Sequence, residues 1–218
     1  METYPRADER SRMVERDIRA RGVSNARVLN AMREIPRHIF IPPPYDTSAY
    51  DDNPLPIGNG QTISQPYIVA RMTELLDPKS DDNLLEIGSG SGYQTAILAA
   101  LSHHVTSIER IPRVADLARK NLAALGAKNV HIVVGDGTLG YPADAPYDGI
   151  LITAATPAIP RPLIDQLAPG GRLVAPVGDR EIQELVSIIR RDGELVRSSH
   201  GGVRFVPLIG VHGWEENA

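Results

Sequence analysis

Apolar residues recur along the central part of the chain in two alternating patterns. Short runs rich in valine, isoleucine and leucine predict four strands, at residues 84–87, 105–109, 130–134 and 149–153. Apolar residues at helical spacing predict three helices, at residues 66–76, at residues 95–101 and from Pro112 to a stop at Gly126. Strands that alternate with helices in this way are typical of a parallel sheet.

The pattern changes in the last third of the chain. In order, it predicts a short helix at 162–167 broken by Pro169-Gly170-Gly171, a strand at 172–177, a hairpin of 184–190 and 194–199 around the Asp192-Gly193 turn, and one more strand at 203–209. The expected fold is therefore a Rossmann-like, doubly wound α/β fold. Its sheet is mostly parallel, with helices on both faces and an antiparallel edge hairpin.

The first sixty residues are expected to form a helical extension and a long ordered loop. Residues 8–21 form one helix, and Ser24 or Asn25 caps a second helix that ends at Pro36. The prolines that follow exclude regular helix or central strand. We expect one domain in three parts: an N-terminal extension at 1–60, a ligand-binding core at 61–177 and C-terminal antiparallel strands at 178–218.

Composition narrows the possible functions. A net charge of −4 gives no broad basic field of the kind that binds nucleic acid. The absence of cysteine excludes disulfides, thiolate catalysis and cysteine zinc sites, and the histidines show no metal-ligand spacing, so we expect no metal. No apolar run is long enough to span a membrane, and no signal peptide is visible. We expect a cytoplasmic monomer that binds neither nucleic acid nor membranes.

Residues able to bind a ligand gather where the predicted strands end. The first strand runs into a turn with three alternate glycines, in which Gly88 and Gly90 let the backbone amides approach a nucleotide-like ligand. Glu109 ends the second strand, Asp136 follows the third and Thr153 ends the fourth. Because the carboxyl ends of parallel strands meet at one edge of a sheet, these residues predict a ligand site at the topological switch point.

The spacing of the glycines distinguishes two nucleotide-like ligands. A dinucleotide dehydrogenase uses G-x-G-x-x-G/A, whereas here Gly92 comes one residue early and Tyr93 occupies the dehydrogenase position. Glu109 can accept hydrogen bonds from ribose hydroxyls in either class, and Asp136 can reach an adenine amino group. This combination is what S-adenosylmethionine methyltransferases use, and their cofactor carries no phosphate that would need a lysine.

Several stretches resemble the protein-L-isoaspartate O-methyltransferase family over roughly residues 24–210. They are Arg37–Pro42, Pro54–Gly58, Gln61–Tyr67, Leu85–Tyr93, Ser107–Arg110, Gly135–Gly137, Ile152–Ala155, Gly170–Val174 and Phe205–Leu208. The glycine motif is shared by methyltransferases in general. The Thr62–Pro66 and Phe205–Leu208 stretches are specific to this family.

The resemblance implies a protein-repair enzyme whose partners are damaged proteins and peptides. Such an enzyme transfers a methyl group from S-adenosyl-L-methionine to the α-carboxylate of L-isoaspartyl residues, and more weakly to D-aspartyl side chains, leaving S-adenosyl-L-homocysteine. The ester then closes to a succinimide that partly reopens to aspartyl. Ser64 is implied as the active-site serine, which would orient the reacting groups and would not act as a nucleophile.

The resemblance also implies where each molecule binds. The cofactor is expected at Thr62, Ile63, Ser64, Gly88, Gly90, Glu109, Asp136 and Gly137, and the substrate peptide at Ile57, Ser64, Thr153, Ala154 and Val206. Two alternatives stay open: a methyltransferase of the same fold that acts on a small molecule, and a binding module without catalytic activity. A serine hydrolase is disfavoured, because the sequence has no G-x-S-x-G motif.

Overall fold

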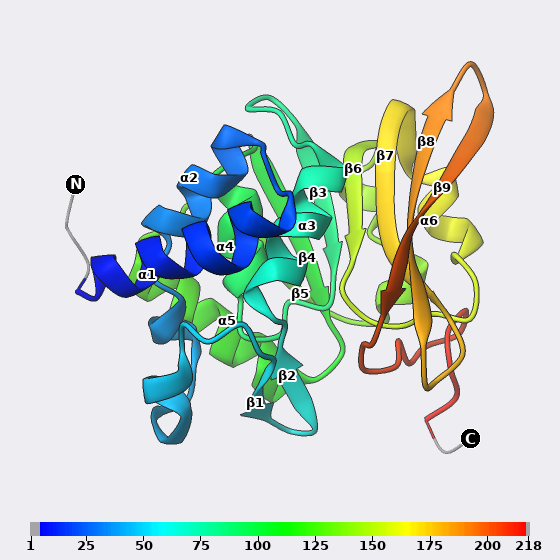
Figure 1. The fold of residues 1–218 in the computed structure, drawn as a ribbon. Coiled ribbons are helices and arrows are strands. Elements are labelled where there is room, and N and C mark those ends of the chain that lie inside the picture. Colours follow the sequence, from blue (N-terminus) through cyan, green and yellow to red (C-terminus); the bar gives the residue numbers. More distant parts are fainter. Residues whose placement is uncertain (1–4, 217–218) are drawn as a thin grey trace.

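A seven-stranded sheet forms the centre of the molecule in the computed structural model, which describes residues 5–216 (Figure 1). The strands lie in the order β5-β4-β3-β6-β7-β8-β9. Their bounds are β3 Asn83–Ile87, β4 His104–Glu109, β5 Val130–Val134, β6 Tyr147–Ile152, β7 Leu167–Gly178, β8 Gln183–Arg191 and β9 Glu194–Val203. Strands β3 to β7 pair in parallel, and β8 and β9 add an antiparallel edge. The predicted Rossmann-like fold is confirmed.

Within residues 5–216, six α-helices accompany the sheet. They are α1 Ala7–Met13, α2 Ala26–Glu34, α3 Pro66–Leu76, α4 Tyr93–Ala99, α5 Pro112–Leu125 and α6 Arg161–Asp165. A π-helical turn at Val14–Ile18 extends α1, and short 3₁₀ turns lie at Arg19–Arg21, Arg37–Phe40, Pro43–Ser48, Gly137–Leu139 and Pro142–Asp144. None of the described helices is both long enough and apolar enough to cross a bilayer.

Strands β3 and β6 are buried on both faces, because their side chains point alternately to two sides of the sheet and both sides are covered. On one face, Leu84 and Leu151 pack with Leu76 of α3 and with α4. On the other, Leu85 packs with Leu163 of α6 and the loops around it. The strands therefore read as continuous apolar runs and not as alternating ones.

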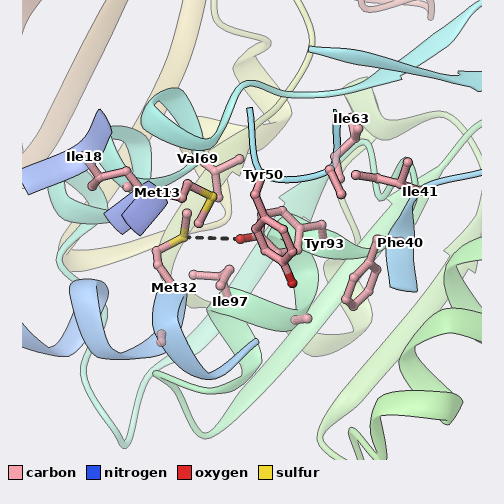
Figure 2. Packing of buried hydrophobic residues seen from close by; sticks show 14 of the residues in the cluster. Met13, Ile18, Met32, Phe40, Ile41, Tyr50, Ile63, Val69, Tyr93 and Ile97 are labelled. Carbon is pink, nitrogen blue, oxygen red and sulfur yellow. Dashed lines mark hydrogen bonds between the residues drawn. The ribbon is translucent and has the colours of Figure 1, made fainter. Parts of the chain in front are cut away.

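The N-terminal helices continue the core that covers α4. Figure 2 shows Met13, Ile18 and Met32 beside Tyr93 and Ile97 of α4, and all five side chains are buried. The Tyr93 hydroxyl donates to the Met32 sulfur at 3.8 Å. The extension is thus part of the packed molecule, and it seals the helix that follows the glycine turn.

The ends of helices and turns match the sequence prediction closely where the sequence carries a clear capping or turn residue. Helix α3 begins at Pro66, and Gly126 ends α5 in the left-handed conformation with φ 79°. The Asn25 side chain caps α2 by accepting from the amides of Arg27 and Val28. Asp192 and Gly193 both have positive φ, as a two-residue hairpin turn requires.

Three predictions about the strands were wrong. Residues taken as loop form a small antiparallel hairpin, β1 Leu55–Gly58 and β2 Gln61–Ile63. Strand β7 starts at Leu167, five residues before the predicted start at 172. It runs through Pro169-Gly170-Gly171, which was expected to separate the preceding helix from the strand. The strand expected at 203–209 does not form: Val203 ends β9, and isolated bridges follow, between Ala155 and Pro207 and between Ile209 and Trp214. Val206 O and Leu208 N make the first bridge, and the chain then turns back at Gly210, so the pairing with the sheet goes no further.

Candidate active site

A pocket of about 270 Å³ lies at the carboxyl ends of β3, β4 and β6. The chain runs from β3 outward through β4 to β5 and then returns to place β6 on the other side of β3, so the pocket is at the predicted switch point. The β2 hairpin strand with the residues after it, and the segment Val206–Ile209, form the other walls. Distant parts of the sequence therefore meet around one cavity.

The glycine turn presents its backbone to this pocket in a conformation that side chains disfavour. Gly88, Gly90 and Gly92 have φ angles of 97°, 53° and 89°. At Gly88 a Cβ would press on the Thr153 hydroxyl, and at Gly92 it would meet the backbone of Ala118 in α5. The first glycine thus allows close approach of β6, and the third allows close approach of a helix.

Glu109 holds the turn and the start of the next loop together. Its Oε2 accepts from the Gly90 amide at 3.1 Å, and its Oε1 accepts from the Ile111 amide at 3.0 Å. The side chain is buried and lines the pocket. Each carboxylate oxygen can accept a second hydrogen bond, so Glu109 can still receive two ribose hydroxyls.

A buried carboxyl group, that of Glu86, supports the glycine turn through hydrogen bonds inside the protein. Glu86 in β3 accepts hydrogen bonds from the hydroxyls of Thr95 and Ser107, each at 2.5 Å, and Ser107 contacts the Ser89 hydroxyl at 2.7 Å. Burial, with a smaller contribution from Glu109, raises the pKa of Glu86 to about 8, and the two hydrogen bonds only partly oppose this. Burial therefore favours the protonated, neutral form of this group. Sequence analysis missed it because its role depends on contacts across the sheet.

Ser64 lies between β2 and α3 and lines the pocket. Gln65, not Ser64, is the N-cap residue of α3, and no hydrogen bond ties the Ser64 hydroxyl to any residue that the structure describes. The hydroxyl is thus available to a ligand, whereas a simple capping role would have occupied it. Thr62 and Ile63, which precede it, also line the pocket.

Asp52 fixes the chain next to Ser64, and sequence reasoning missed this residue too. Its Oδ1 accepts from the Tyr67 amide at 2.9 Å, and its Oδ2 accepts from Gln65 Nε2 at 2.6 Å. Arg21 pairs with the same carboxylate at 2.6 Å and stacks over the Tyr67 ring. The Gln-Pro-Tyr sequence after Ser64 therefore serves as an anchor to the N-terminal extension.

The residues expected to contact a peptide line the pocket, with one exception. Thr153, Ala154 and Val206 line the pocket. The Thr153 hydroxyl lies 2.9 Å from the Ile87 carbonyl and 2.7 Å from the Gly88 carbonyl, and its single hydrogen is donated to one of them or shared between them. Toward a ligand it can therefore only accept. Ile57 is buried in the core on β1 and does not line the cavity.

Asp136 also lies outside the lining, although Gly137 beside it is part of the wall. Its Oδ1 accepts from the amide and hydroxyl of Thr138, and its Oδ2 accepts from the Val211 amide at 2.8 Å. The half-buried side chain therefore contacts Val211 of residues 206–216, which we call the C-terminal segment, and is not part of the cavity lining. The sequence pattern located the residue at the correct strand end but not the direction of its carboxylate.

The donor and acceptor set fits S-adenosylmethionine. Glu109 offers carboxylate oxygens for a ribose, and the glycine turn offers backbone at close range. Of the residues that line the described pocket, Arg110 is the one full positive charge, and Glu216 pairs with it at 2.8 Å. A phosphate group would thus find no free cation, whereas a sulfonium nucleoside needs none. Among residues 5–216, no three His, Asp or Glu side chains gather as a metal site would require.

Comparisons with known proteins agree with this geometry. The family model of protein-L-isoaspartate(D-aspartate) O-methyltransferase matches residues 8–213. Protein-L-isoaspartate O-methyltransferase from Methanoregula boonei is 63% identical over 213 residues, covering 97% of this chain and 98% of the relative. The enzyme of the same name from Methanoculleus marisnigri is 60% identical over 215 residues, covering 99% and 98%.

Solved structures give the same result. A protein-L-isoaspartate O-methyltransferase superposes with a TM-score of 0.81 at 29% identity, covering 95% of this chain and 67% of the other. A Plasmodium falciparum protein of this name, solved in complex with S-adenosyl-L-homocysteine, superposes with a TM-score of 0.79 at 25% identity, covering 92% and 98%. The chain described here therefore belongs to the protein-L-isoaspartate(D-aspartate) O-methyltransferase family.

Proposed function

We propose that this protein methylates the α-carboxylate of L-isoaspartyl residues, and more weakly the side chain of D-aspartyl residues, in damaged proteins and peptides. The observation that carries the proposal is the meeting of the Ser64 loop with the glycine turn around one pocket. When bound, S-adenosylmethionine supplies a methyl group on a positively charged sulfur. The resulting ester would close to a succinimide and restore part of the aspartyl.

The residues of the pocket would act by positioning the cofactor and the acceptor carboxylate. A carboxylate has an ordinary pKa of about 4 and is ionised at neutral pH, so the acceptor needs no general base. Glu109 would hold the ribose, and the backbone from Thr62 to Ser64 and from Gly88 to Gly90 would hold the rest of the cofactor. Holding two reactants in near-attack geometry is itself a large rate effect. The Ser64 hydroxyl would orient the incoming carboxylate or the methyl donor.

The peptide would lie between the β1–β2 hairpin, Thr153 with Ala154, and Val206. Backbone pairing in this channel would suit many sequences, because main-chain hydrogen bonds carry no side-chain information. The buried position of Ile57 supports an indirect role, in which it shapes the hairpin beneath the peptide. The single domain, the cytoplasmic location and the monomeric state expected from the sequence stay predictions.

Matched peptides test the proposal. The protein is incubated with methyl-labelled S-adenosylmethionine and three peptides that differ only in one residue: L-isoaspartyl, L-aspartyl or D-aspartyl. We expect base-labile label on the isoaspartyl peptide, less on the D-aspartyl peptide and none on the aspartyl peptide. Equal labelling of all three, or label on a small metabolite in place of peptides, would contradict the proposal. Cofactor binding without transfer to any acceptor would point to a binding module.

A further inference from the structure

Gln94 is a polar residue of the pocket that has no part in the function proposed above. It lies in the first turn of α4, directly after the glycine turn, and lines the same cavity as Ser64. The residue is only 9% exposed. Buried polar groups need hydrogen-bond partners, so the partners of its amide group decide what this side chain can do.

The amide nitrogen of Gln94 is held inside the protein. Gln94 Nε2 donates to Thr73 Oγ1 of α3 at 2.9 Å, and Thr73 Oγ1 donates to the Val69 carbonyl at 2.8 Å. A threonine hydroxyl has one hydrogen, so Thr73 can only accept from Gln94. The amide atom that faces Thr73 must then be the nitrogen, and this contact fixes the orientation of the amide group. The oxygen, Oε1, occupies the other branch.

Oε1 has no partner among the residues that the structure describes. No hydrogen bond within residues 5–216 reaches it. It also differs from the side-chain atoms of Arg37, Glu86 and Trp214 that are sealed in the described core without a partner. The oxygen is therefore accessible, and the cavity that Gln94 lines is where a ligand can reach it. Gln94 thus offers the pocket an oriented, neutral acceptor.

The order of the strands indicates which part of the cofactor meets this oxygen. Strand β4 ends at Glu109, the proposed ribose contact, and β5 with Gly137 after it lies on one side while β3 lies on the other. With the adenine toward Gly137, the amino-acid part of the cofactor extends past the end of β3, where α4 begins. That part carries an ammonium group, which only donates, and a carboxylate, which only accepts. Oε1 therefore suits the ammonium group.

We propose that Gln94 is a cofactor-binding residue whose Oε1 accepts a hydrogen bond from the α-ammonium group of S-adenosylmethionine. This inference rests on the proposed function, because it concerns the same cofactor site. Glu109 is the one carboxylate among the described residues that line the pocket, and it serves the glycine turn and the ribose. Gln94 supplies a separate acceptor for the ammonium group, and Thr73, which orients the amide, is a positioning residue.

Three ligands distinguish this contact from general packing. They are S-adenosyl-L-homocysteine, its analogue with hydrogen in place of the α-amino group, and its analogue with hydrogen in place of the α-carboxyl group. Titration calorimetry gives the dissociation constant of each for the wild type and for Gln94→Met, which keeps the side-chain length and removes both polar atoms. We expect Gln94→Met to weaken the two amino-bearing ligands about tenfold and to leave the deaminated analogue unchanged.

Two further variants extend the test. Thr73→Val releases the Gln94 amide, which can then turn its nitrogen toward the ammonium group, so we expect it to weaken the two amino-bearing ligands only. Gln166→Met is the matched control. Gln166 is also buried, but it lies outside the pocket lining, and its amide pairs with Tyr141 N and Leu139 O. Its loss should leave the ratios of the three dissociation constants as in the wild type.

The results that overturn the inference are definite. Equal weakening of all three ligands by Gln94→Met would show a packing role, and unchanged affinity for S-adenosyl-L-homocysteine would show that the contact is absent. Should Gln94→Met fail to fold, Thr73→Val decides the matter alone, and unchanged ratios then contradict the inference. A wild-type protein that binds none of the three ligands contradicts the inference together with the proposed function. A protein that shows the expected ratios but labels no isoaspartyl peptide contradicts the proposed function only.

Discussion

Ser64 is a pocket residue whose hydroxyl is free to bind a ligand. Its hydroxyl makes no hydrogen bond to the described chain, and helix α3 is capped without it. We expect Ser64→Ala to lower kcat/KM for an isoaspartyl peptide by about tenfold or more, because orientation of the reacting groups is lost. The melting temperature should stay unchanged. Steady-state kinetics and thermal melts check both expectations.

Ser102→Ala is the matched control for this substitution. The Ser102 hydroxyl donates to the Leu98 carbonyl at 2.8 Å after α4, and Ser102 does not line the described pocket. Its loss should leave kcat/KM as in the wild type. Full activity of Ser64→Ala would refute the orienting role.

Glu86 makes the stability of the folded protein depend on pH in a predictable direction. The pKa of its carboxyl is about 8 when folded against an ordinary 4.5, so between these values the folded chain holds a proton that the unfolded chain releases. The contribution of Glu86 to wild-type stability must then fall as pH rises through that window. We expect Glu86→Gln, which cannot titrate, to gain melting temperature relative to wild type by about 3 °C or more between about pH 5 and about pH 8.

Thermal melts at several pH values measure this difference. Glu34→Gln, on the exposed side of α2, is the control, and its difference from wild type should not rise over the same range. A difference between Glu86→Gln and wild type that is flat with pH, or that falls, would mean that Glu86 is ionised in the folded protein.

At the scale of elements, the position of the first turn of α3 beside the pocket depends on Asp52, a residue outside this helix. Asp52 caps the first turn of α3 through Tyr67 N and holds Gln65, the residue after Ser64. We expect Asp52→Ala to cost about 1 kcal/mol of stability, the usual loss for a helix cap, and also to lower methyl transfer by displacing Ser64. Thermal melts and the peptide assay measure the two effects.

Asp46→Ala is the control from the same loop. Asp46 pairs with Arg6 at 3.0 Å in an exposed position, and pairs of this kind contribute little. Its removal should leave both the melting temperature and the activity close to the wild-type values. If Asp52→Ala behaves as Asp46→Ala does, the anchoring role of Asp52 is wrong.

Most elements with a local signal were predicted, with one exception. Pro66 and Gly126 mark helix ends through their own backbone preferences, and the Asp192-Gly193 turn requires the positive φ that these residues tolerate. The β1–β2 hairpin carries the same kind of signal in Asn59-Gly60, which both have positive φ, and it was overlooked because its short strands contain a proline. Residues 203–209 carry a strand-like apolar pattern, but the chain turns back at Gly210 after a single bridge to the sheet.

For the whole molecule, the N-terminal extension and the Rossmann-like part share one core. Met13, Ile18 and Met32 pack in the same cluster as Tyr93 of α4 (Figure 2). Glu74 of α3 also accepts from the amides of Ser24 and Asn25, at 2.7 and 2.9 Å. Unfolding of the extension alone would leave a large apolar surface in water, so separate transitions are unfavourable.

We therefore expect one cooperative thermal transition. Far-ultraviolet circular dichroism reports on all helices, including α1 and α2, while Trp214 fluorescence reports on the C-terminal segment. The two melting curves should coincide, as two-state unfolding requires. A first step in circular dichroism that fluorescence does not follow would show that the extension is a separate unit, contrary to the single domain predicted from the sequence.

The sequence alone was sufficient to predict which groups lie at the end of which strand: a glycine turn after β3, Glu109 at the end of β4, Asp136 after β5 and Thr153 after β6. This was possible because a parallel sheet brings the carboxyl ends of its strands to one edge whatever the loops do. The directions of side chains at that edge depended on tertiary structure alone. The Asp136 carboxylate accepts from the Val211 amide, and burial raises the pKa of Glu86, because residues far away in the chain supply surroundings that no local pattern encodes.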